Sequence, residues 1–311
     1  MPSFKNLRII FMGTPEFAVT SLNALVNAGC TIVAVITAPD KPAGRGMALQ
    51  QSAVKQYALS KGLNILQPEK LKNPGFITDL KKLNADLQIV VAFRMLPEVV
   101  WGMPPMGTIN LHGSLLPQYR GAAPINWAII NGEKETGVTT FLLQQQIDTG
   151  NILMQERFPI TESDNAGTLH DKMKEIGAAV LLQTVQEMAN GTLQSKPQNI
   201  ADEQQLKHAP KIFTETCKID FNKPVEEVFN LIRGLSPYPA AFTLFNNKKL
   251  KIYSADKNLT PPQIAPGHWQ TDKKNYLQFA CSNGSIHVLE LQLEGKKKMK
   301  IDEFLRGYRF E

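Results

Sequence analysis

Residues 107–125 read GTINLHGSLLPQYRGAAPI, and they decide the predicted fold of the chain. Asn110 and His112 alternate with aliphatic residues, so in a β-strand these two polar side chains share one face. Gly113 ends the strand, and Pro117 predicts a turn because it cannot donate a ladder hydrogen bond. Asn110 and His112 then lie at a strand end, where open α/β sheets bind ligands. The spacing alone also fits a polar strand edge followed by an ordinary surface turn.

The N-terminal residues predict a strand, a helix and a second strand. Residues 7–12 (LRIIFM) and 31–37 (TIVAVIT) are continuous apolar runs, which are typical of buried parallel strands. Between them, Thr14 is predicted to cap a helix whose first residue is Pro15. This order predicts a right-handed crossover, so the fold class is α/β with a Rossmann-like, mostly parallel sheet. The G-x-G-x-x-G pattern is missing, so a dinucleotide site is not indicated.

Residues 38–51 (APDKPAGRGMALQQ) form a predicted loop at the ligand-binding edge of this sheet. The segment exceeds the roughly 2 to 6 residues of an ordinary connection between a strand and a helix. Lys41 and Arg45 lie on backbone that is rich in glycine and proline, which suits contact with nucleic acid. A plain flexible connection is the alternative.

Asp148 lies in a second loop of the same kind. Residues 147–150 (IDTG) follow a strand predicted at 137–144, so Asp148 is also expected at a strand end. An aspartate before Thr-Gly is commonly just turn chemistry, in which its carboxylate accepts bonds from nearby backbone groups.

The chain divides into two predicted domains, since 311 residues exceed the roughly 100 to 200 of a typical one. Residues 191–210 are polar with little periodicity and predict a linker between domains at 1–190 and 211–311. Before the linker, residues 168–171 (TLHD) resemble a capping box and predict a helix to about Ala189. The second domain holds several short predicted strands, which favours a small β-barrel. Their bounds are 241–245, 250–255, 267–271, 276–281 and 286–293.

The excess positive charge lies entirely in the C-terminal third. Residues 1–206 hold 17 Lys plus Arg and 17 Asp plus Glu, whereas residues 207–311 hold 17 and 11, which gives the net charge of +6. A basic domain joined to a neutral one suits a polyanion such as nucleic acid, and a merely lysine-rich surface is the alternative. Lys296, Lys297 and Lys298 form a basic turn there.

Cysteine usage and hydropathy narrow the class of protein. Cys30, Cys217 and Cys281 are far apart and include no Cys-x-x-Cys pair, so neither a disulfide framework nor a zinc site is predicted. No metal is expected. No run approaches the roughly 18 apolar residues of a membrane span, and the N-terminal apolar run is shorter than that of an export signal. We expect a soluble, cytoplasmic protein with no membrane partner.

The string HGSLLPQYRGAAPI resembles the core motif of the formyltransferases that use 10-formyltetrahydrofolate. The resemblance runs from Leu7 to about Phe304 and is closest to the branch of the family that acts on methionyl initiator tRNA. It implies a Rossmann-like catalytic domain and an OB-like C-terminal domain that binds tRNA. The implied activity is transfer of the formyl group from 10-formyltetrahydrofolate to the α-amine of methionyl-tRNA, for translation initiation.

The resemblance also assigns roles to residues. It places Asp148 beside Asn110 and His112 as the catalytic group. Asn110 and a protonated His112 can donate hydrogen bonds to the oxyanion of a tetrahedral intermediate, and the Asp148 carboxylate would favour the charged imidazole. It matches the PAGRG segment to the loop that enters the tRNA acceptor end, with Arg45 at the position of the arginine that carries this role. The folate contacts that it implies lie at Ser114, Leu115, Leu116 and Pro117.

The chain departs from the family pattern at two places. Residues 93–97 (FRMLP) lack the Tyr-Gly of relatives and are one residue shorter, and Gln146 replaces a glycine.

The alternative functions fit the sequence less well. One alternative is a relative that formylates a small amine, such as glycinamide ribonucleotide or a nucleotide sugar, or that deformylates formyltetrahydrofolate. Such a relative would need neither the basic C-terminal domain nor the PAGRG loop. A non-enzymatic RNA-binding protein on the same scaffold would not need Asn110, His112 and Asp148.

Overall fold

The computed structural model describes residues 3–43, 48–200 and 203–310, and its chain contacts divide into two compact units. Unit 1 comprises residues 1–120, 137–158 and 170–207, and unit 2 comprises residues 121–136, 159–169 and 208–311. The units are therefore built from segments that alternate along the chain. The domain and linker ranges proposed from the sequence stay a prediction.

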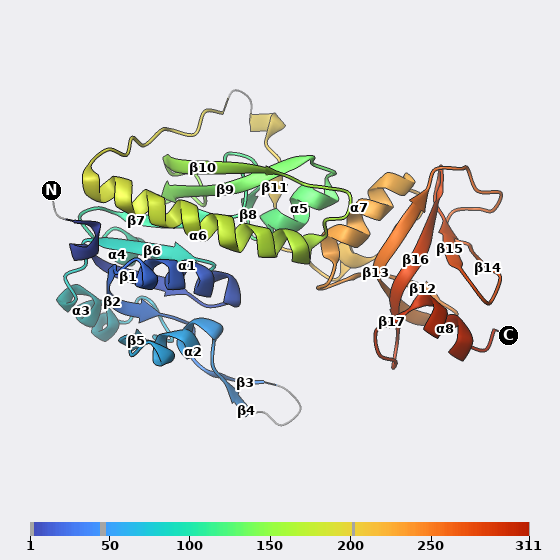
Figure 1. The fold of residues 1–311 in the computed structure, drawn as a ribbon, viewed down its shortest axis with the longest axis horizontal. Coiled ribbons are helices and arrows are strands. Elements are labelled where there is room, and N and C mark those ends of the chain that lie inside the picture. The colour runs from blue at the N-terminus through green and yellow to red at the C-terminus, as the bar shows by residue number, and fades with distance from the viewer. Residues whose placement is uncertain (1–2, 44–47, 201–202, 311) are drawn as a thin grey trace. The chain divides into compact units, whose positions relative to one another are not determined.

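Unit 1 is built on a seven-stranded sheet in the order β10-β9-β7-β6-β1-β2-β5. The five strands from β7 to β5 are mutually parallel, and β9 pairs with β7 in the antiparallel direction. The predicted α/β fold with a mostly parallel sheet is confirmed (Figure 1). The strands are β1 (Arg8–Gly13), β2 (Thr31–Ile36), β5 (Ile65–Leu66), β6 (Leu87–Val91), β7 (Thr108–His112), β9 (Glu135–Leu142) and β10 (Ile152–Pro159).

Helices cover both faces of this sheet. Buried side chains of α3 and α4 pack with Ile10, Met12 and Val90 on one face. On the other face, α6 approaches β7 so closely that a Cβ at Gly177 would lie 2.9 Å from the Leu111 side chain. Asn110 is in register with Val90, so Asn110 lies on the face covered by α3 and α4. The helices are α1 (Glu16–Asn27), α2 (Ala53–Ser60), α3 (Pro74–Lys82), α4 (Glu98–Trp101) and α6 (Ala166–Asn190).

Two predicted helix caps were wrong. The extended residue before α1 is Pro15, and no side chain caps this helix, because Thr14 is one residue too early to do so. At α6, Thr168 N donates to Asn165 Oδ1 and Asn165 N donates to Thr168 Oγ1, both at 3.0 Å. The reciprocal capping pair is thus Asn165 and Thr168, three residues before the predicted pair of Thr168 and Asp171.

Three other segments of unit 1 differ from a simple interpretation of the sequence. The predicted loop at 38–51 contains a β-hairpin, β3 (Lys41–Ala43) with β4 (Ala48–Gln50), which extends away from the sheet (Figure 1). Strand β10 was not predicted, because it lies at the sheet edge and its side chains are mostly half-buried or exposed. Part of the predicted linker is packed, since Lys196 pairs with Ile152 through two backbone hydrogen bonds of 2.7 and 2.8 Å.

Unit 2 contains a curled antiparallel sheet in the order β12-β13-β16-β15-β14, with β17 beside β16. All five predicted strands are present, and the Asn246-Asn247 turn between β12 and β13 has two positive φ angles, 47° and 60°, as a tight hairpin requires. The sheet is a half-barrel, in agreement with the predicted fold class. Its strands are β12 (Ala241–Phe245), β13 (Lys248–Asn258), β14 (Trp269–Thr271), β15 (Leu277–Ala280), β16 (Ser285–Leu293) and β17 (Met299–Lys300).

Helices α5 (Pro124–Ile130) and α7 (Val225–Leu235) pack together within unit 2, where Asn126 Nδ2 donates to Gly234 O at 2.7 Å. Helix α8 (Ile301–Gly307) was not predicted; it buries Phe304 and Leu305 in the core of the half-barrel. Two very short strands, β8 (Arg120–Gly121) and β11 (His208–Ala209), form a separate pair. None of the helices in the described ranges has a stretch long and apolar enough to cross a membrane.

Candidate active site

His112 is the last residue of β7, and its imidazole is buried with both ring nitrogens facing an acceptor. Nε2 lies 2.9 Å from the Tyr119 carbonyl oxygen, and Nδ1 lies 3.8 Å from Oδ2 of Asp148. Because a carbonyl only accepts hydrogen bonds, Nε2 carries the proton and Nδ1 is the nitrogen that can change its protonation state. The separation of 3.8 Å is too long for a hydrogen bond, and it is an ion-pair distance only when the imidazole is protonated. The expected juxtaposition of His112 and Asp148 is present.

Asp148 is held in a constrained loop between β9 and β10. Its φ is +54°, in the left-handed region, which non-glycine residues adopt at some cost. Two residues on, Gly150 passes so close to β9 that an added Cβ would lie 1.6 Å from the Leu142 carbonyl oxygen. Gln198 Nε2 donates to the carbonyl oxygens of Asp148 and Gly150, both at 2.8 Å. These contacts fix the backbone that carries the carboxylate.

Asn110 differs from its neighbours in β7 because it is the one residue of this strand that is not fully buried. Thr108, two residues earlier on the same face, is engaged: its hydroxyl donates to the Trp101 carbonyl at 2.6 Å. The side-chain amide of Asn110 has no hydrogen-bond partner among the described residues. The amide is therefore available to a ligand at the strand end beside His112.

The turn after His112 is fastened to β9 and β10 by side chains that the sequence did not single out. Thr139 Oγ1 donates to Ser114 O at 2.6 Å and accepts from Leu116 N at 3.2 Å. Gln155 Nε2 donates to Leu116 O at 2.9 Å. The peptide bond between Leu116 and Pro117 is cis.

The four residues that the sequence assigned to folate differ in their exposure. Ser114 is buried, and its hydroxyl donates to Gln118 O at 2.7 Å. Leu116 is buried as well, whereas Leu115 and Pro117 are half-buried. Any contact of Ser114 or Leu116 with a bound molecule therefore has to use the backbone or follow a rearrangement.

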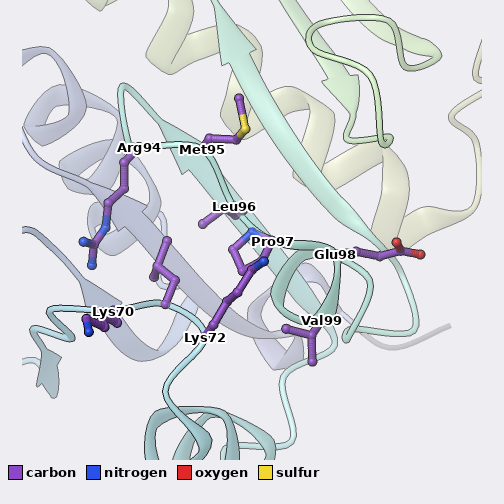
Figure 2. A pocket seen from close by; sticks show the side chains of 9 residues that line it. Lys70, Lys72, Arg94, Met95, Leu96, Pro97, Glu98 and Val99 are labelled. Atoms are coloured by element: carbon purple, nitrogen blue, oxygen red, sulfur yellow. The ribbon is translucent and has the colours of Figure 1, made fainter.

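An open groove of about 690 Å³ lies beyond the end of β6. Its lining includes residues 94–97 of the shortened turn, and Figure 2 shows Arg94 and Met95 directed to different sides of that turn. Arg94 donates to backbone carbonyls of Pro68 and Glu69, whereas the Met95 side chain is 74% exposed. The groove is apolar with a cationic rim. Its lining residues are Lys70, Leu71, Lys72, Arg94, Met95, Leu96, Pro97, Glu98 and Val99.

Comparison with known proteins adds to this geometry. Residues 6–185 match the model of the formyl transferase family, and residues 211–309 match the model of the formyl transferase C-terminal domain. The chain belongs to the formyl transferase family. The family predicted from the HGSLLPQYRGAAPI string is thereby confirmed.

Relatives match the chain of this formyl transferase over nearly its whole length. Methionyl-tRNA formyltransferase of Bacteroides fragilis is 54% identical over 310 residues, which cover 98% of this chain and 96% of that protein. Methionyl-tRNA formyltransferase of Flavobacterium johnsoniae is 50% identical over 310 residues, with 98% of both chains covered.

Solved structures share the fold at low sequence identity. WlaRD, a sugar 3N-formyl transferase determined in the presence of dTDP and 5-N-formyl-THF, matches with a TM-score of 0.68 at 23% identity, over 94% of this chain and 99% of that one. HypX from Aquifex aeolicus in complex with tetrahydrofolic acid matches with a TM-score of 0.65 at 17% identity, over 97% of this chain and 48% of that one.

The residues predicted to contact tRNA lie in both units. Lys41 is exposed on β3, and Arg45 lies outside the described residues. Lys296, Lys297 and Lys298 are exposed in the turn before β17. Lys298 is already engaged, since its ammonium lies 2.7 Å from Glu290 Oε2 and 4.8 Å from the centre of the Tyr253 ring.

One group of possible metal ligands occurs among the described residues, at Glu16, His170 and Asp171 on α1 and α6. Lys174 Nζ lies 2.9 Å from Glu16 Oε1 and 3.2 Å from Asp171 Oδ1. The lysine thus supplies the positive charge that these two carboxylates require, and the hydrogen bonds from His170 and, next, Lys174 lower the pKa of Asp171.

Proposed function

We propose that this formyl transferase moves the formyl group of 10-formyltetrahydrofolate onto the α-amine of methionyl initiator tRNA. The proposal is supported by relatives of that name at 50 to 54% identity over almost the whole chain. The single observation that carries the chemistry is the accessible amide of Asn110 beside the buried pair of His112 and Asp148. The amine acceptor belongs to translation initiation, so we propose that the protein works in the cytoplasm.

The groove beyond β6 fits a folate formyl donor, which is a substrate here. Its volume of about 690 Å³ lies within the roughly 300 to 1,000 Å³ of small-molecule sites. Leu96 and Pro97 offer apolar surface for flat aromatic rings, and Lys70 and Lys72 offer charge for the glutamate carboxylates. Strand β6 neighbours β7 in the sheet, so a donor bound in the groove can present its formyl group near Asn110. We propose that the turn at 114–117 completes this pocket.

Asn110 and His112 would stabilise the oxyanion that forms when the amine attacks the formyl carbon. Asn110 offers a neutral N–H donor whose proton is not lost at neutral pH. His112 Nε2 at present donates to a neutral carbonyl, that of Tyr119. A hydrogen bond to an anionic oxygen is roughly twice as strong, so a developing oxyanion can take over this donor.

Asp148 has two tasks in the proposed reaction. A new bond joins the amine nitrogen to the formyl carbon, the bond from that carbon to the donor nitrogen breaks, the amine loses a proton and the donor nitrogen gains one. The Asp148 carboxylate faces His112 Nδ1 at 3.8 Å and helps to orient the imidazole, and it or a water that it holds accepts the amine proton. The amine of an aminoacyl ester is substantially neutral at pH 7, because an α-amine has a pKa of roughly 7.7 and the ester lowers it.

The basic C-terminal segment and the β3-β4 hairpin are the proposed tRNA contacts. Phosphate contacts from Lys296, Lys297 and Lys298 would supply affinity that does not depend on sequence. Lys41 on β3, together with Arg45, would guide the acceptor end to the site. No metal is proposed for the reaction, because the formyl donor is already activated.

A substrate comparison tests the proposal. The protein is incubated with 10-formyltetrahydrofolate and, separately, with methionyl initiator tRNA, glycinamide ribonucleotide, an amino nucleotide sugar or no acceptor. Formylation of methionyl-tRNA alone supports the proposal. Formylation of a small amine in its place identifies another branch of the family, and formate release without an acceptor identifies a deformylase. tRNA binding without any turnover identifies a non-enzymatic protein.

A further inference from the structure

The side chain of Gln198 joins the two loops that hold His112 and Asp148. Its amide nitrogen donates to the carbonyl oxygens of Asp148 and Gly150, both at 2.8 Å. Its amide oxygen accepts from Nε and one terminal nitrogen of Arg120, at 3.1 and 2.5 Å. Arg120 ends the turn that begins after His112. One half-buried side chain therefore makes four hydrogen bonds between two active-site loops.

The chemistry of these partners fixes both the orientation and the identity of residue 198. A guanidinium only donates hydrogen bonds and a carbonyl only accepts them, so the oxygen of Gln198 faces Arg120 and the nitrogen faces the two carbonyls. Glutamate would oppose both carbonyls with a carboxylate oxygen. Lysine or arginine would oppose the guanidinium with a second cation. Asparagine has the same amide but one methylene less reach.

The backbone that carries Gln198 is itself fastened to the site. Lys196 pairs with Ile152 at the start of β10, two residues before Gln198. Further along, the Tyr119 N–H donates to the Lys207 carbonyl at 2.6 Å, and the Lys207 N–H donates to Gln118 Oε1 at 2.8 Å. Lys207 therefore contacts the turn that supplies the carbonyl partner of His112 Nε2.

We propose that Gln198 is a positioning residue for formyl transfer. It fixes the Asp148 backbone on one side of His112, and through Arg120 it fixes the neighbouring Tyr119 carbonyl on the other. The imidazole is thus held in the Nε2–H form, with Nδ1 toward the carboxylate. Gln198 touches neither substrate in this account. The expected loss of turnover rests on the proposed function. The expected change in the His112 tautomer rests on the hydrogen bonds alone.

Three variants of the full-length protein test the inference: Gln198→Ala, Gln198→Glu and Gln194→Ala. Gln194 is the matched control, because it is exposed in the same segment and its side chain makes no hydrogen bond within the described residues. Gln198→Ala should lower kcat on the order of 10- to 100-fold, with little change in KM for either substrate. Gln198→Glu should be no more active than Gln198→Ala, although it keeps the acceptor for Arg120. Gln194→Ala should match wild type.

A second measurement separates positioning from folding. NMR of isotope-labelled histidine should show neutral His112 as the Nε2–H tautomer in wild type and Gln194→Ala, and a mixture of tautomers in Gln198→Ala. Wild-type turnover in Gln198→Ala, or a loss of turnover with an unchanged tautomer and a lowered unfolding temperature, would overturn the inference. If wild type itself does not formylate methionyl-tRNA, the proposed function fails, and the tautomer comparison still decides the role of Gln198.

Discussion

Asp148 approaches His112 to 3.8 Å at Nδ1, while the other ring nitrogen of His112 donates to the Tyr119 carbonyl at 2.9 Å. The imidazole is thus held between an anion and a neutral acceptor that belong to two different loops. Both side chains are largely buried, with 6% of His112 and 12% of Asp148 exposed. Because electrostatic interactions weaken with distance and with access of water, small movements of either loop should affect catalysis more than folding.

Gly150→Ala should impair catalysis through the Asp148 loop. An added Cβ would lie 1.6 Å from the Leu142 carbonyl oxygen, so the loop has to move. We expect destabilisation of about 3 kcal/mol and a larger relative loss of turnover. Urea unfolding and steady-state kinetics measure both quantities. Gly307→Ala is the control, since a Cβ at Gly307 meets no atom within 4 Å, and it should leave both quantities unchanged. Wild-type kinetics for Gly150→Ala would show that the loop position does not matter.

Arg45→Ala should impair formylation of methionyl-tRNA and spare folate binding. Arg45 lies outside the described residues, so this prediction rests on the PAGRG resemblance and on the exposed position of Lys41, four residues earlier in the sequence. Arg45→Lys should restore part of the activity, because lysine keeps the charge and loses the planar fork. A small amine that mimics the aminoacyl end should be formylated equally by wild type and variant. Equal loss with both acceptors would assign Arg45 to the chemistry or the fold.

Lys296→Gln combined with Lys297→Gln should reduce the salt dependence of tRNA binding. Each lost phosphate contact flattens the plot of log affinity against log salt by roughly 0.7 to 0.9. Lys298→Gln should change the slope less, because Lys298 is already paired with Glu290. Lys82→Gln on α3 is a control for an exposed lysine outside the basic turn. An unchanged slope in the double variant would remove the C-terminal turn from the tRNA surface.

The buried cysteine thiols should not react with a disulfide reagent in the folded protein. They should also make the stability of the fold decline at high pH, where thiols ionise. Burial raises the pKa of the Cys30 thiol to about 11 and that of Cys281 to about 12. Thiolates are the reactive form, so a disulfide reagent should modify these thiols only after denaturation. Both folded pKa values exceed the ordinary 9.0, so burial of the neutral thiols stabilises the fold fully below that pH.

This contribution is lost as the pH rises from about 9 toward 11, where the unfolded chain ionises first. Urea midpoints across this range measure the loss, and Cys281→Ala should show a shallower decline than wild type. An equal decline in Cys281→Ala, or rapid labelling of the native protein, would contradict the assignment.

Periodicity and turn residues predicted much of the fold, because these signals are local. The alternation of Asn110 and His112 with aliphatic residues placed both on one face of β7, and the structure has them there. The Asn246-Asn247 turn and the five C-terminal strands were found for the same reason. Strand β10 and the β3-β4 hairpin were not found, since edge strands with exposed side chains carry no alternating apolar pattern.

The contacts that complete the site depend on residues distant in sequence. The expected meeting of Asp148 with His112 followed from the family resemblance, because the local sequence alone fitted ordinary turn chemistry. Gln198 lies 50 residues from Asp148 in a polar segment that suggested a linker. Its role is visible only once the Asp148 loop and Arg120 are placed on either side of it.

The most direct test of the account is the single-turnover rate of formyl transfer from 10-formyltetrahydrofolate to methionyl initiator tRNA, compared between wild type and His112→Ala. The oxyanion exists only during the reaction, so His112→Ala should lower this rate roughly a hundredfold or more while tRNA and folate binding stay near wild type. A near-normal rate with weakened binding of either substrate would contradict the account, because His112 would then be a binding residue rather than part of the catalytic group.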